Sequence, residues 1–368
     1  MKSSKSRYQI SVMSWNIQDS TGDGFSKFEN PEFLKILQLG NVICLQETKK
    51  QIKLDGYISF NSNRKGSRSG GVCILAENQL RKGISSVSCK ESDDIVVAKL
   101  DKNFFKLDFD LFIVCFYISP PNSSYSKKIS DYTENTFAAL NQVCARLRNK
   151  GEIIICGDFN ARTGTQADFV SSCNAGAMHD IYQDIGLPQD TETPRNNSDP
   201  TVVEPHSQLF LDTVINNQLQ ILNGRVLGDI TGKLTCHKSN GSSLVDYFVI
   251  SSWARDHVDS LQITDFTSFS DHCPLVLKLT LFEPFECSHS LPDFSSLQAG
   301  YKWDNTNSPA LFKAALSSSL ISSSLTEIMN SDPPTTMEGN SQLNNQMVDC
   351  LQRAANTCLL YTSPSPRD

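Results

Sequence analysis

One stretch in the middle of the chain constrains the fold more than any other: Glu152-Ile153-Ile154-Ile155-Cys156-Gly157-Asp158-Phe159-Asn160. Its apolar run predicts a buried strand. The chain then presents a carboxylate and an amide. Because residues two apart in an extended chain face the same way, Asp158 and Asn160 are expected to project together from the strand's end. Burying such polar groups in a hydrophobic core would cost free energy, whereas at a functional site they can bind or react. The alternative interpretation is an Asp/Asn turn that only closes the strand.

Strands and helices alternate on both sides of this stretch. Leu111 to Tyr117 predicts another strand, and Pro274 to Leu281 predicts a closing one. Asp131 to Lys150 predicts the longest helix, because its apolar residues recur at helical spacing and Gly151 follows it. Leu209 to Leu219 has helical spacing as well. This alternation predicts one α/β sandwich domain over residues 8–281.

The character of the chain changes after Leu281. Ser317 to Ser324 is of low complexity, and apolar residues at helical spacing follow it. We therefore expect residues 282–368 to be a linker and a helical extension. The last residues, from Thr362 on, resemble no folded element and are predicted to be non-native sequence.

Charge and composition limit the classes of partner. The formal net charge of −7 argues against a broad basic face for nucleic acid, although an enzyme can also grip phosphates through a metal ion and a few local cations. One local group of cations exists, opposed by Asp55 alone: Lys49, Lys50, Lys53, Arg64, Lys65 and Arg68. Within it, Arg64, Lys65 and Arg68 are the candidates for substrate binding. The alternative is an ordinary solvated face.

The cysteines indicate a reducing compartment. The chain has 12 of them, scattered, with no CxxC pair and no spacing typical of a zinc site. The first residues are basic and polar rather than apolar, and no run approaches the length of a membrane span. These features predict a nuclear or cytoplasmic protein with no membrane partner.

Polar side chains recur at the ends of the predicted strands, and we call this set the polar rim. Its members are Asn16, Glu47, Tyr117, Asp158, Asn160, Asp246, Ser270, Asp271 and His272. One or two such residues would be ordinary turn chemistry. Several carboxylates gathered at one edge would repel one another without a cation. The polar rim therefore predicts a functional site.

The residue types in the polar rim suggest hydrolytic chemistry. Glu47 and Asn16 offer oxygen ligands to a hard cation such as Mg²⁺, which can neutralise charge in an in-line displacement at phosphorus. Asp158 can accept a proton from water that Asn160 holds. His272 can donate to a phosphate while Asp246 fixes its tautomer and raises its pKa. Taken singly, His272 is more often a surface histidine and Glu47 a solvated turn acid.

Six motifs, in chain order, resemble the signatures of the endonuclease/exonuclease/phosphatase superfamily. They are Ser14-Trp15-Asn16, Leu45-Gln46-Glu47, Ser69-Gly70-Gly71-Val72, Gly157-Asp158-Phe159-Asn160, Leu244-Val245-Asp246-Tyr247 and Ser270-Asp271-His272. The resemblance covers Tyr8 to Leu281. It implies a four-layer sandwich, two mixed β-sheets flanked by helices, with Mg²⁺ or Mn²⁺ as cofactor.

The resemblance also implies roles for individual residues. Glu47 matches the metal ligand, with Asn16 and Asp271 assisting. The residues that match catalytic positions are Asp158, Asn160, Tyr117 and His272, with Asp246 as the partner of His272. Thr235 resembles a phosphate-contacting threonine of retrotransposon members.

Within the superfamily the sequence favours the endonuclease of non-LTR (LINE-type) retrotransposons. Tyr301-Lys302-Trp303-Asp304 and the helix after it resemble the connector that precedes reverse transcriptase there, so DNA is the expected substrate and a reverse transcriptase region the expected partner in the full-length parent. Gln18 stands where apurinic endonucleases carry an Asp, which speaks against abasic-site repair. A catalytically idle binding domain and a phosphatase or lipid phosphodiesterase stay as alternatives, and the sequence leaves the oligomeric state open.

Overall fold

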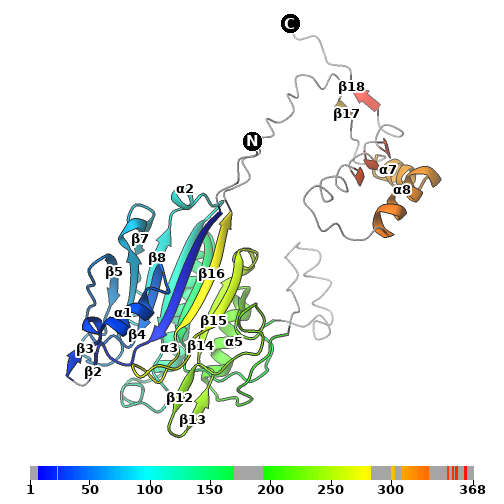
Figure 1. Ribbon diagram of the computed structural model, residues 1–368. Coiled ribbons are helices and arrows are strands. Elements are labelled where there is room, and N and C mark those ends of the chain that lie inside the picture. Colours follow the sequence, from blue (N-terminus) through cyan, green and yellow to red (C-terminus); the bar gives the residue numbers. More distant parts are fainter. Residues whose placement is uncertain are drawn as a thin grey trace. The chain divides into compact units, whose positions relative to one another are not determined.

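The computed structural model describes residues 7–22, 24–169, 194–282, 300–302, 308–330, 346–347, 350–351, 353–354 and 360–362. The chain divides into two compact units, Met1–Phe285 and Glu286–Asp368 (Figure 1). The predicted domain bounds, residues 8–281 and 282–368, stay predictions. The predicted non-native residues 363–368 and the Trp303-Asp304 part of the connector lie outside the described residues.

Two six-stranded sheets form the first unit. One has the order β15-β16-β1-β4-β6-β5, and the other the order β11-β14-β10-β9-β8-β7. The strands of the first sheet are β1 (Arg7–Asn16), β4 (Val42–Gln46), β5 (Tyr57–Ser62), β6 (Val72–Glu77), β15 (Val258–Ile263) and β16 (Leu275–Phe282). Those of the second are β7 (Ile84–Val87), β8 (Ile95–Leu100), β9 (Asp110–Tyr117), β10 (Gly151–Asp158), β11 (Leu219–Ile221) and β14 (Asp246–Ser251).

Helices cover the outer faces of both sheets, and short hairpins extend from the sandwich. The helices among the described residues of this unit are α1 (Pro31–Leu37), α2 (Lys102–Phe105), α3 (Tyr132–Leu147), α5 (His206–Asn216) and α6 (Ser252–Arg255), with short 3-10 turns η1 (Lys27–Glu29), η2 (Asn78–Leu80) and η3 (Ser126–Lys128). The hairpins pair β2 (Thr21–Gly22) with β3 (Phe25–Ser26), and β12 (Cys236–Lys238) with β13 (Gly241–Ser243).

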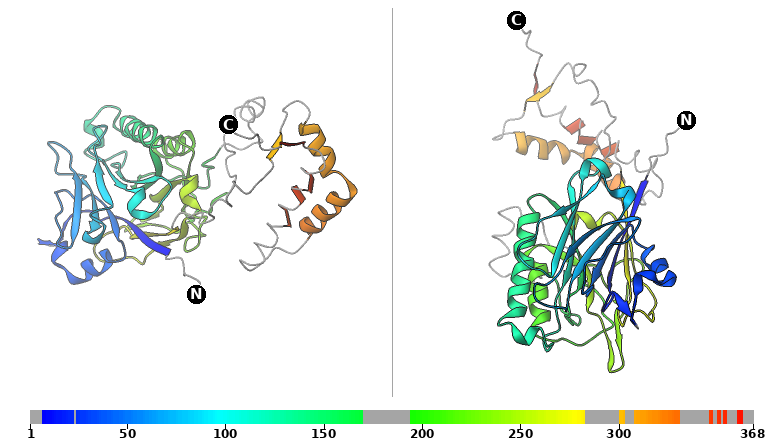
Figure 2. Two further views of the ribbon diagram at one scale, coloured as in Figure 1. Left: turned by 90° about the horizontal axis from the view of Figure 1, so that it is seen from above. Right: turned by 90° about the vertical axis from the view of Figure 1, so that its left-hand side faces the viewer.

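Three apolar clusters hold the layers together. The central cluster joins the facing sides of the two sheets, with Cys44 from one and Ile154 from the other among its members. A second packs α3 and α5 on the outer face of the second sheet, where Phe210 lies 4.3 Å from Phe159 between ring centroids. A third packs α1 on the first sheet. The order helix, sheet, sheet, helix is visible in Figure 2 and confirms the predicted four-layer α/β sandwich.

The predicted elements are present, with shifts at their ends. α3 lies inside the predicted 131–150, and β16 lies one residue beyond the predicted closing strand. α5 begins at His206 rather than at the predicted Leu209. Its first turn is buried but polar, so apolar spacing did not reveal it. The helix ends at Asn216 because the chain turns there, through the left-handed Gln218, into β11.

Strand register brings the polar rim to one end of the sandwich. β9 and β10 run parallel with Tyr117 opposite Asp158, and antiparallel β14 places Asp246 opposite Asp158. In the first sheet, parallel β1 and β4 place Asn16 opposite Gln46, directly before Glu47. The two sheets therefore present the ends of these strands at one edge.

The second unit contains α7 (Ser308–Leu316), α8 (Ser319–Asn330) and the strand pair β17 (Gly300–Lys302) with β18 (Leu360–Thr362). Ala315, Ile321, Cys350 and Ala354 form a small apolar cluster within it. In the described part of the chain, no helix is both long and apolar enough to cross a lipid bilayer.

Candidate active site

Asn16 connects the two sheets at the polar rim. Its side-chain amide donates to Glu47 Oε1 at 3.0 Å and to Asp158 Oδ2 at 2.9 Å. Its own Oδ1 accepts the backbone N–H of Gln18 at 2.9 Å. One buried amide therefore touches both the predicted metal ligand and the carboxylate that ends β10.

Asn160 wraps around Asp158 in a turn after β10 ends, rather than continuing an extended strand with the two-residue period that was predicted. Its backbone N–H donates to Asp158 Oδ1 at 2.9 Å, and its side-chain amide donates to Asp158 Oδ2 at 3.1 Å and to the Ile118 carbonyl at 2.7 Å. Asn160 is left-handed, with φ of 44°. Gly157, with φ of 150°, lies so close to the Phe116 carbonyl that a side chain there would collide with it. The turn is thus built around the Asp158 carboxylate.

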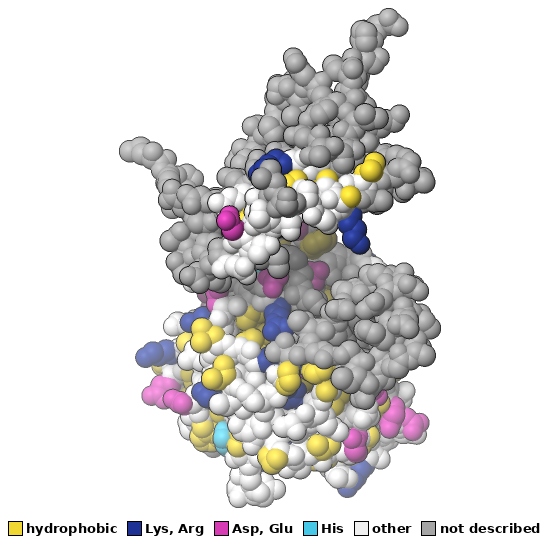
Figure 3. All heavy atoms as spheres, turned by 90° about the vertical axis from the view of Figure 1, so that its right-hand side faces the viewer, with side chains coloured by type: hydrophobic (Ala, Val, Ile, Leu, Met, Phe, Trp, Pro, Cys, Tyr) yellow, Lys and Arg dark blue, Asp and Glu magenta, His cyan; other side chains and the backbone are white. Residues whose placement is uncertain are grey.

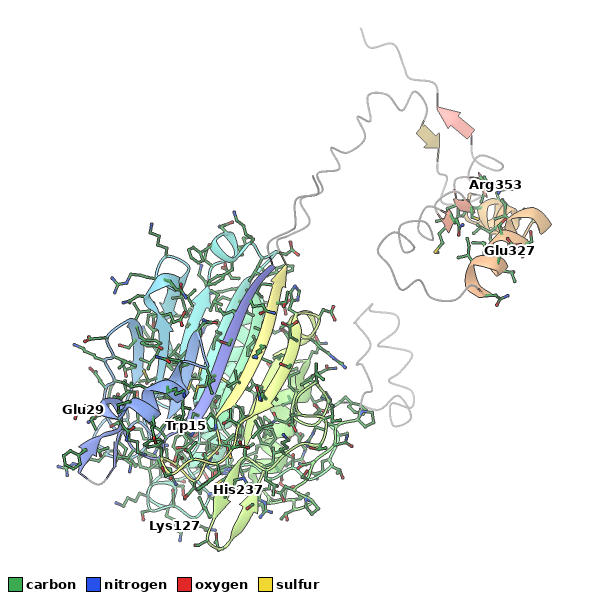
Figure 4. The ribbon with its side chains drawn as sticks, in the orientation of Figure 1. Trp15, Glu29, Lys127, His237, Glu327 and Arg353 are labelled. Atoms are coloured by element: carbon green, nitrogen blue, oxygen red, sulfur yellow. The ribbon has the colours of Figure 1, made fainter. Side chains whose placement is uncertain are left out.

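His272 and Asp246 form a buried ion pair. His272 Nδ1 lies 2.8 Å from Asp246 Oδ2 and 3.0 Å from Oδ1. A carboxylate can only accept, so Nδ1 carries a proton and Nε2 is the ring atom that remains for other partners. Nε2 lies 3.5 Å from Cys236 Sγ and 4.0 Å from Asp158 Oδ2. Trp15 Nε1 donates to the His272 carbonyl at 2.8 Å, and Figure 4 labels Trp15 at this end of the sandwich.

The crowded charges shift the pKa values in the polar rim. Burial, with the charge of Asp246, raises the pKa of Asp158 to about 7. Burial alone would lower the pKa of His272, but the charge and hydrogen bond of Asp246 outweigh it, so this pKa lies well above its ordinary value. Burial, with the charges of Glu47 and Asp158, raises the pKa of Tyr117 well above its ordinary value. Burial and the neighbouring charges therefore act together on Asp158, His272 and Tyr117.

Asp271 joins the polar rim through Gln18. Gln18 Nε2 donates to Asp271 Oδ2 at 2.8 Å, and Gln18 Oε1 accepts the Asp271 backbone N–H at 3.0 Å. Gln18 is left-handed, with φ of 59°. The residue that departs from the apurinic-endonuclease pattern therefore bridges Asn16 and Asp271.

The donor set of the polar rim fits a hard divalent cation. Glu47 and Asp158 supply carboxylate oxygens at the Asn16 amide, and Asp271 supplies another that is bound to Gln18; such oxygens are the ligands that Mg²⁺ and Mn²⁺ prefer. Among the described residues, Asp158, Asp246 and His272 also place one ligand atom each within 4.8 Å of one another. A bound cation would offset both the burial of the Asp158 carboxylate and the charge of Asp246, which together raise the pKa of Asp158.

Thr235 is fully buried against Asp246. Its hydroxyl donates to Asp246 Oδ2 at 2.7 Å and accepts the backbone N–H groups of Val245 and Asp246. The resemblance implied a phosphate contact for Thr235. Its single hydroxyl proton is instead engaged by Asp246, so in this structure Thr235 orients the partner of His272.

The three predicted substrate-binding cations separate in the structure. Lys65 and Arg68 are exposed, whereas Arg64 is buried. Arg64 pairs with both oxygens of Asp94, at 2.6 and 2.9 Å, and donates to Ser119 and Tyr132. Gly70, in the Ser69-Gly70-Gly71 motif, lies against its guanidinium. Arg64 is therefore a packed interior residue rather than a free cation, which corrects the sequence expectation.

Arg64→Met keeps much of the side-chain bulk but leaves Asp94 buried without its partner. Removing one member of a buried ion pair typically costs about 3–5 kcal/mol. We expect a loss of that size in the free energy of unfolding, measured by urea denaturation. Arg68→Met, at an exposed position in the same loop, is the matched control, expected to change it by less than about 0.5 kcal/mol. Equal stability of the two variants would show that Arg64 is not a structural residue.

His206 is a buried residue at the site that sequence reasoning missed. Its Nδ1 lies 3.1 Å from the Asn160 carbonyl, and its Nε2 lies 3.2 Å from Thr133 Oγ1. Because a carbonyl can only accept, Nδ1 carries the proton and Nε2 accepts from the threonine. Burial lowers the pKa of His206 and favours this neutral form. No motif pointed to it, since His206 lies far from Asn160 in sequence.

Comparisons with known proteins agree with this geometry. A protein-family model described as "Endonuclease-reverse transcriptase" matches residues 111–276. An exodeoxyribonuclease of Bacillus subtilis (strain 168) is 23% identical over 289 residues, which is 74% of this chain and 100% of that protein.

Solved structures show the same fold. The AP endonuclease LMAP from Leishmania major matches with a TM-score of 0.53 and 16% identity, over 74% of this chain and 88% of that one. The catalytic domain of Xenopus laevis APE2 matches with a TM-score of 0.51 and 18% identity, over 74% of this chain and 93% of that one. The chain thus has the endonuclease/exonuclease/phosphatase fold, and its resemblance to that superfamily is confirmed.

Proposed function

We propose that the chain is a metal-dependent phosphodiesterase that nicks DNA, as the endonuclease of a LINE-type retrotransposon protein. The observation that carries this proposal is the convergence of Asn16, Glu47, Asp158, Asp246 and His272 at one end of the sandwich. The description of the matching family, an endonuclease joined to a reverse transcriptase, supports the retrotransposon context and a reverse transcriptase region as partner in the parent protein.

Each side chain has a task in the proposed reaction. Asp158 accepts a proton from a water that Asn160 orients, and the water oxygen attacks phosphorus while one phosphorus–oxygen bond of the strand breaks. His272 donates from Nε2 to a phosphate oxygen, and Asp246 holds the ring in that tautomer. Tyr117 lines the same edge beside Asp158. Glu47 and Asp271 would hold Mg²⁺ or Mn²⁺, which when bound polarises a phosphate oxygen and neutralises charge. Asn16, predicted to assist as an oxygen ligand, instead donates its amide N–H groups to Glu47 and Asp158 and would orient these carboxylates.

DNA binding would not depend on a broad basic surface. On the face shown in Figure 3, Lys and Arg side chains are scattered among neutral and acidic ones. Lys65 and Arg68 are exposed in the loop between β5 and β6 and can contact phosphates. Binding through a few such contacts is expected to weaken with salt.

Two substrates test the proposal directly. The full chain with Mg²⁺ is incubated with a supercoiled plasmid and with matched duplexes that are intact or carry one abasic site. We expect nicking of the plasmid and no large preference for the abasic duplex, because Gln18 replaces the Asp of apurinic endonucleases. A strong abasic preference would indicate a repair enzyme. DNA binding without cleavage would indicate an idle binding domain, and hydrolysis of phosphomonoesters or phospholipids alone would indicate a phosphatase or lipid phosphodiesterase.

His206 is expected to act through Asn160. His206→Ala removes the hydrogen bond that anchors the left-handed Asn160, so we expect kcat for nicking to fall roughly tenfold, with KM for DNA little changed. His206→Asn can place an amide N–H near the same carbonyl and should restore part of the rate. In an Asn160→Ala background the His206→Ala loss should disappear. Losses that multiply in the double variant would contradict this positioning role.

A further inference from the structure

One half-buried lysine connects two loops at the polar rim and has no task in the proposed reaction. Lys27 begins the 3-10 turn η1, whose last residue, Glu29, is labelled in Figure 4. Its Nζ donates to the Ile17 carbonyl at 2.7 Å and to the Phe269 carbonyl at 2.6 Å. The first carbonyl directly follows β1, and the second lies in the loop between β15 and β16. One ammonium group therefore joins two segments that are far apart in the sequence.

The two carbonyls belong to the segments that carry a predicted metal ligand and its partner. The Ile17 carbonyl is part of the planar peptide unit that leads into Gln18, and the Phe269 carbonyl lies two residues before Asp271. Gln18 Nε2 donates to Asp271 Oδ2 at 2.8 Å, and Gln18 Oε1 accepts the Asp271 backbone N–H at 3.0 Å. The Lys27 ammonium thus holds both loops next to the point where Gln18 meets Asp271.

The turn that carries Lys27 is anchored independently of the ammonium group. The backbone N–H of Lys27 donates to the Ser20 carbonyl at 2.9 Å. The Phe28 ring meets the Phe33 ring edge to face, with centroids 5.2 Å apart, and Phe33 meets Phe269 in the same way at 5.4 Å. A substitution of Lys27 therefore removes the two hydrogen bonds of Nζ while these backbone and ring contacts remain.

Lys27 has two effects of opposite sign on a divalent cation at Asp271. Its positive charge repels the cation, and this effect alone would weaken binding. Its hydrogen bonds hold the Asp271 loop against Gln18, which strengthens binding because a preorganised metal ligand loses less conformational freedom. The ion pair of Asp19 with Lys49, 3.2 Å between Oδ2 and Nζ, adds no net charge beside Lys27. Solvent around this half-exposed pair screens the charges, so we expect the positioning effect to dominate.

We propose that Lys27 is a positioning residue that raises the affinity of the polar rim for a divalent cation, because it holds the loops of Gln18 and Asp271 together. The inference rests on the proposed metal-dependent function and adds to it a residue from outside the polar rim. Lys27 acts through Asp271 and touches neither the cation nor the DNA.

Metal binding in the absence of DNA tests this role. The full chain is titrated with Mn²⁺, and the spin-resonance signal of free Mn²⁺ gives the dissociation constant. Lys27→Met keeps the length of the aliphatic stem but removes the charge and the donors. One hydrogen bond from a charged group corresponds to about 10- to 150-fold in an equilibrium constant, and only part of this reaches Asp271, so we expect the dissociation constant to rise about tenfold. Lys27→Arg keeps the charge and the donors and should stay within about threefold of wild type.

The dependence of nicking on Mg²⁺ separates positioning from general stability. For Lys27→Met we expect the Mg²⁺ concentration at half-maximal rate to rise about tenfold, while the rate at saturating Mg²⁺ stays within about threefold of wild type. Lys35→Met, at an exposed position on α1, is the matched control and should change neither value. In an Asp271→Asn background, Lys27→Met should weaken Mn²⁺ binding no further.

Three results would overturn the role of Lys27. They are unchanged or tighter Mn²⁺ binding by Lys27→Met, losses of affinity that multiply in the double variant with Asp271→Asn, and a lower thermal unfolding temperature and maximal rate without a shift in metal affinity. A wild-type chain that binds Mn²⁺ but never nicks DNA refutes the proposed function alone, because the Mn²⁺ titration still decides the role of Lys27. A wild-type chain that binds no Mn²⁺ refutes both proposals.

Discussion

Glu47→Gln is expected to lower DNA nicking at least about a thousandfold while the protein stays folded. Removal of divalent cations with EDTA should lower nicking by the wild-type protein to the same extent. EDTA should cause no further loss of nicking in Glu47→Gln. Metal-ion catalysis supplies several kcal/mol of charge stabilisation, and each 1.4 kcal/mol corresponds to a factor of ten in rate. Gln keeps the size of the side chain and its contact with Asn16 while it removes the charge.

Glutamine is a better test here than alanine for a structural reason. Glu47 has φ of 54°, and a left-handed residue next to the end of β4 is sensitive to changes in local contacts. Thermal unfolding should therefore accompany the rate measurement. Glu32→Gln, at an exposed position on α1, is the matched control and should keep full activity. Full nicking by Glu47→Gln, or by wild type in excess chelator, would refute the proposed metal dependence.

His272→Ala is expected to lower the nicking rate by about 10² to 10⁴, the usual contribution of a positioned acid or base, with little effect on DNA affinity. Single-turnover nicking with saturating enzyme measures the rate, and DNA retention in EDTA measures the affinity. Asp246→Asn should lose less, because an amide can still hydrogen bond to the ring Nδ1 and to Thr235.

The double variant distinguishes the roles of the two residues. If Asp246 acts only through His272, His272→Ala/Asp246→Asn is no slower than His272→Ala alone. Losses that multiply would show that Asp246 has a role independent of His272. Such a role would fit the structure, because ligand atoms of Asp246 and Asp158 lie within 4.8 Å of each other. Unchanged rates in both single variants would refute the proposed catalytic role of this ion pair.

Much of the site could be predicted because its members occupy equivalent places on periodic elements. Buried strands are visible as short apolar runs, and the polar residue that ends each run stands out from it. Asp158 and Asn160 were expected to lie together, and in the structure the backbone N–H and the side-chain amide of Asn160 each donate to Asp158, although through a left-handed turn after β10 rather than through the period of a strand. Equivalent strand ends meet at one edge of a sheet, so the polar rim also followed from local pattern.

The environment of each cation could not be predicted in this way. Arg64 and Arg68 lie four residues apart in one polar loop, and nothing local distinguishes them. Arg64 is buried because Asp94, Ser119 and Tyr132 come from other elements and together satisfy its guanidinium. The environment of Thr235 could not be predicted either, since its single hydroxyl proton is engaged by Asp246, which lies 11 residues away at the start of β14.

The sequence by itself determined where the strands lie and which residues end them. Hydrophobic periodicity and turn chemistry act over a few residues, so both can be recognised locally. The tertiary structure decided which of those residues touch. Asn16 and Asp158 are 142 positions apart and meet only because two sheets pack face to face. The same packing buried His206 beneath Asn160 and brought the Phe269 carbonyl to Lys27, since long-range contacts depend on how whole layers fit together.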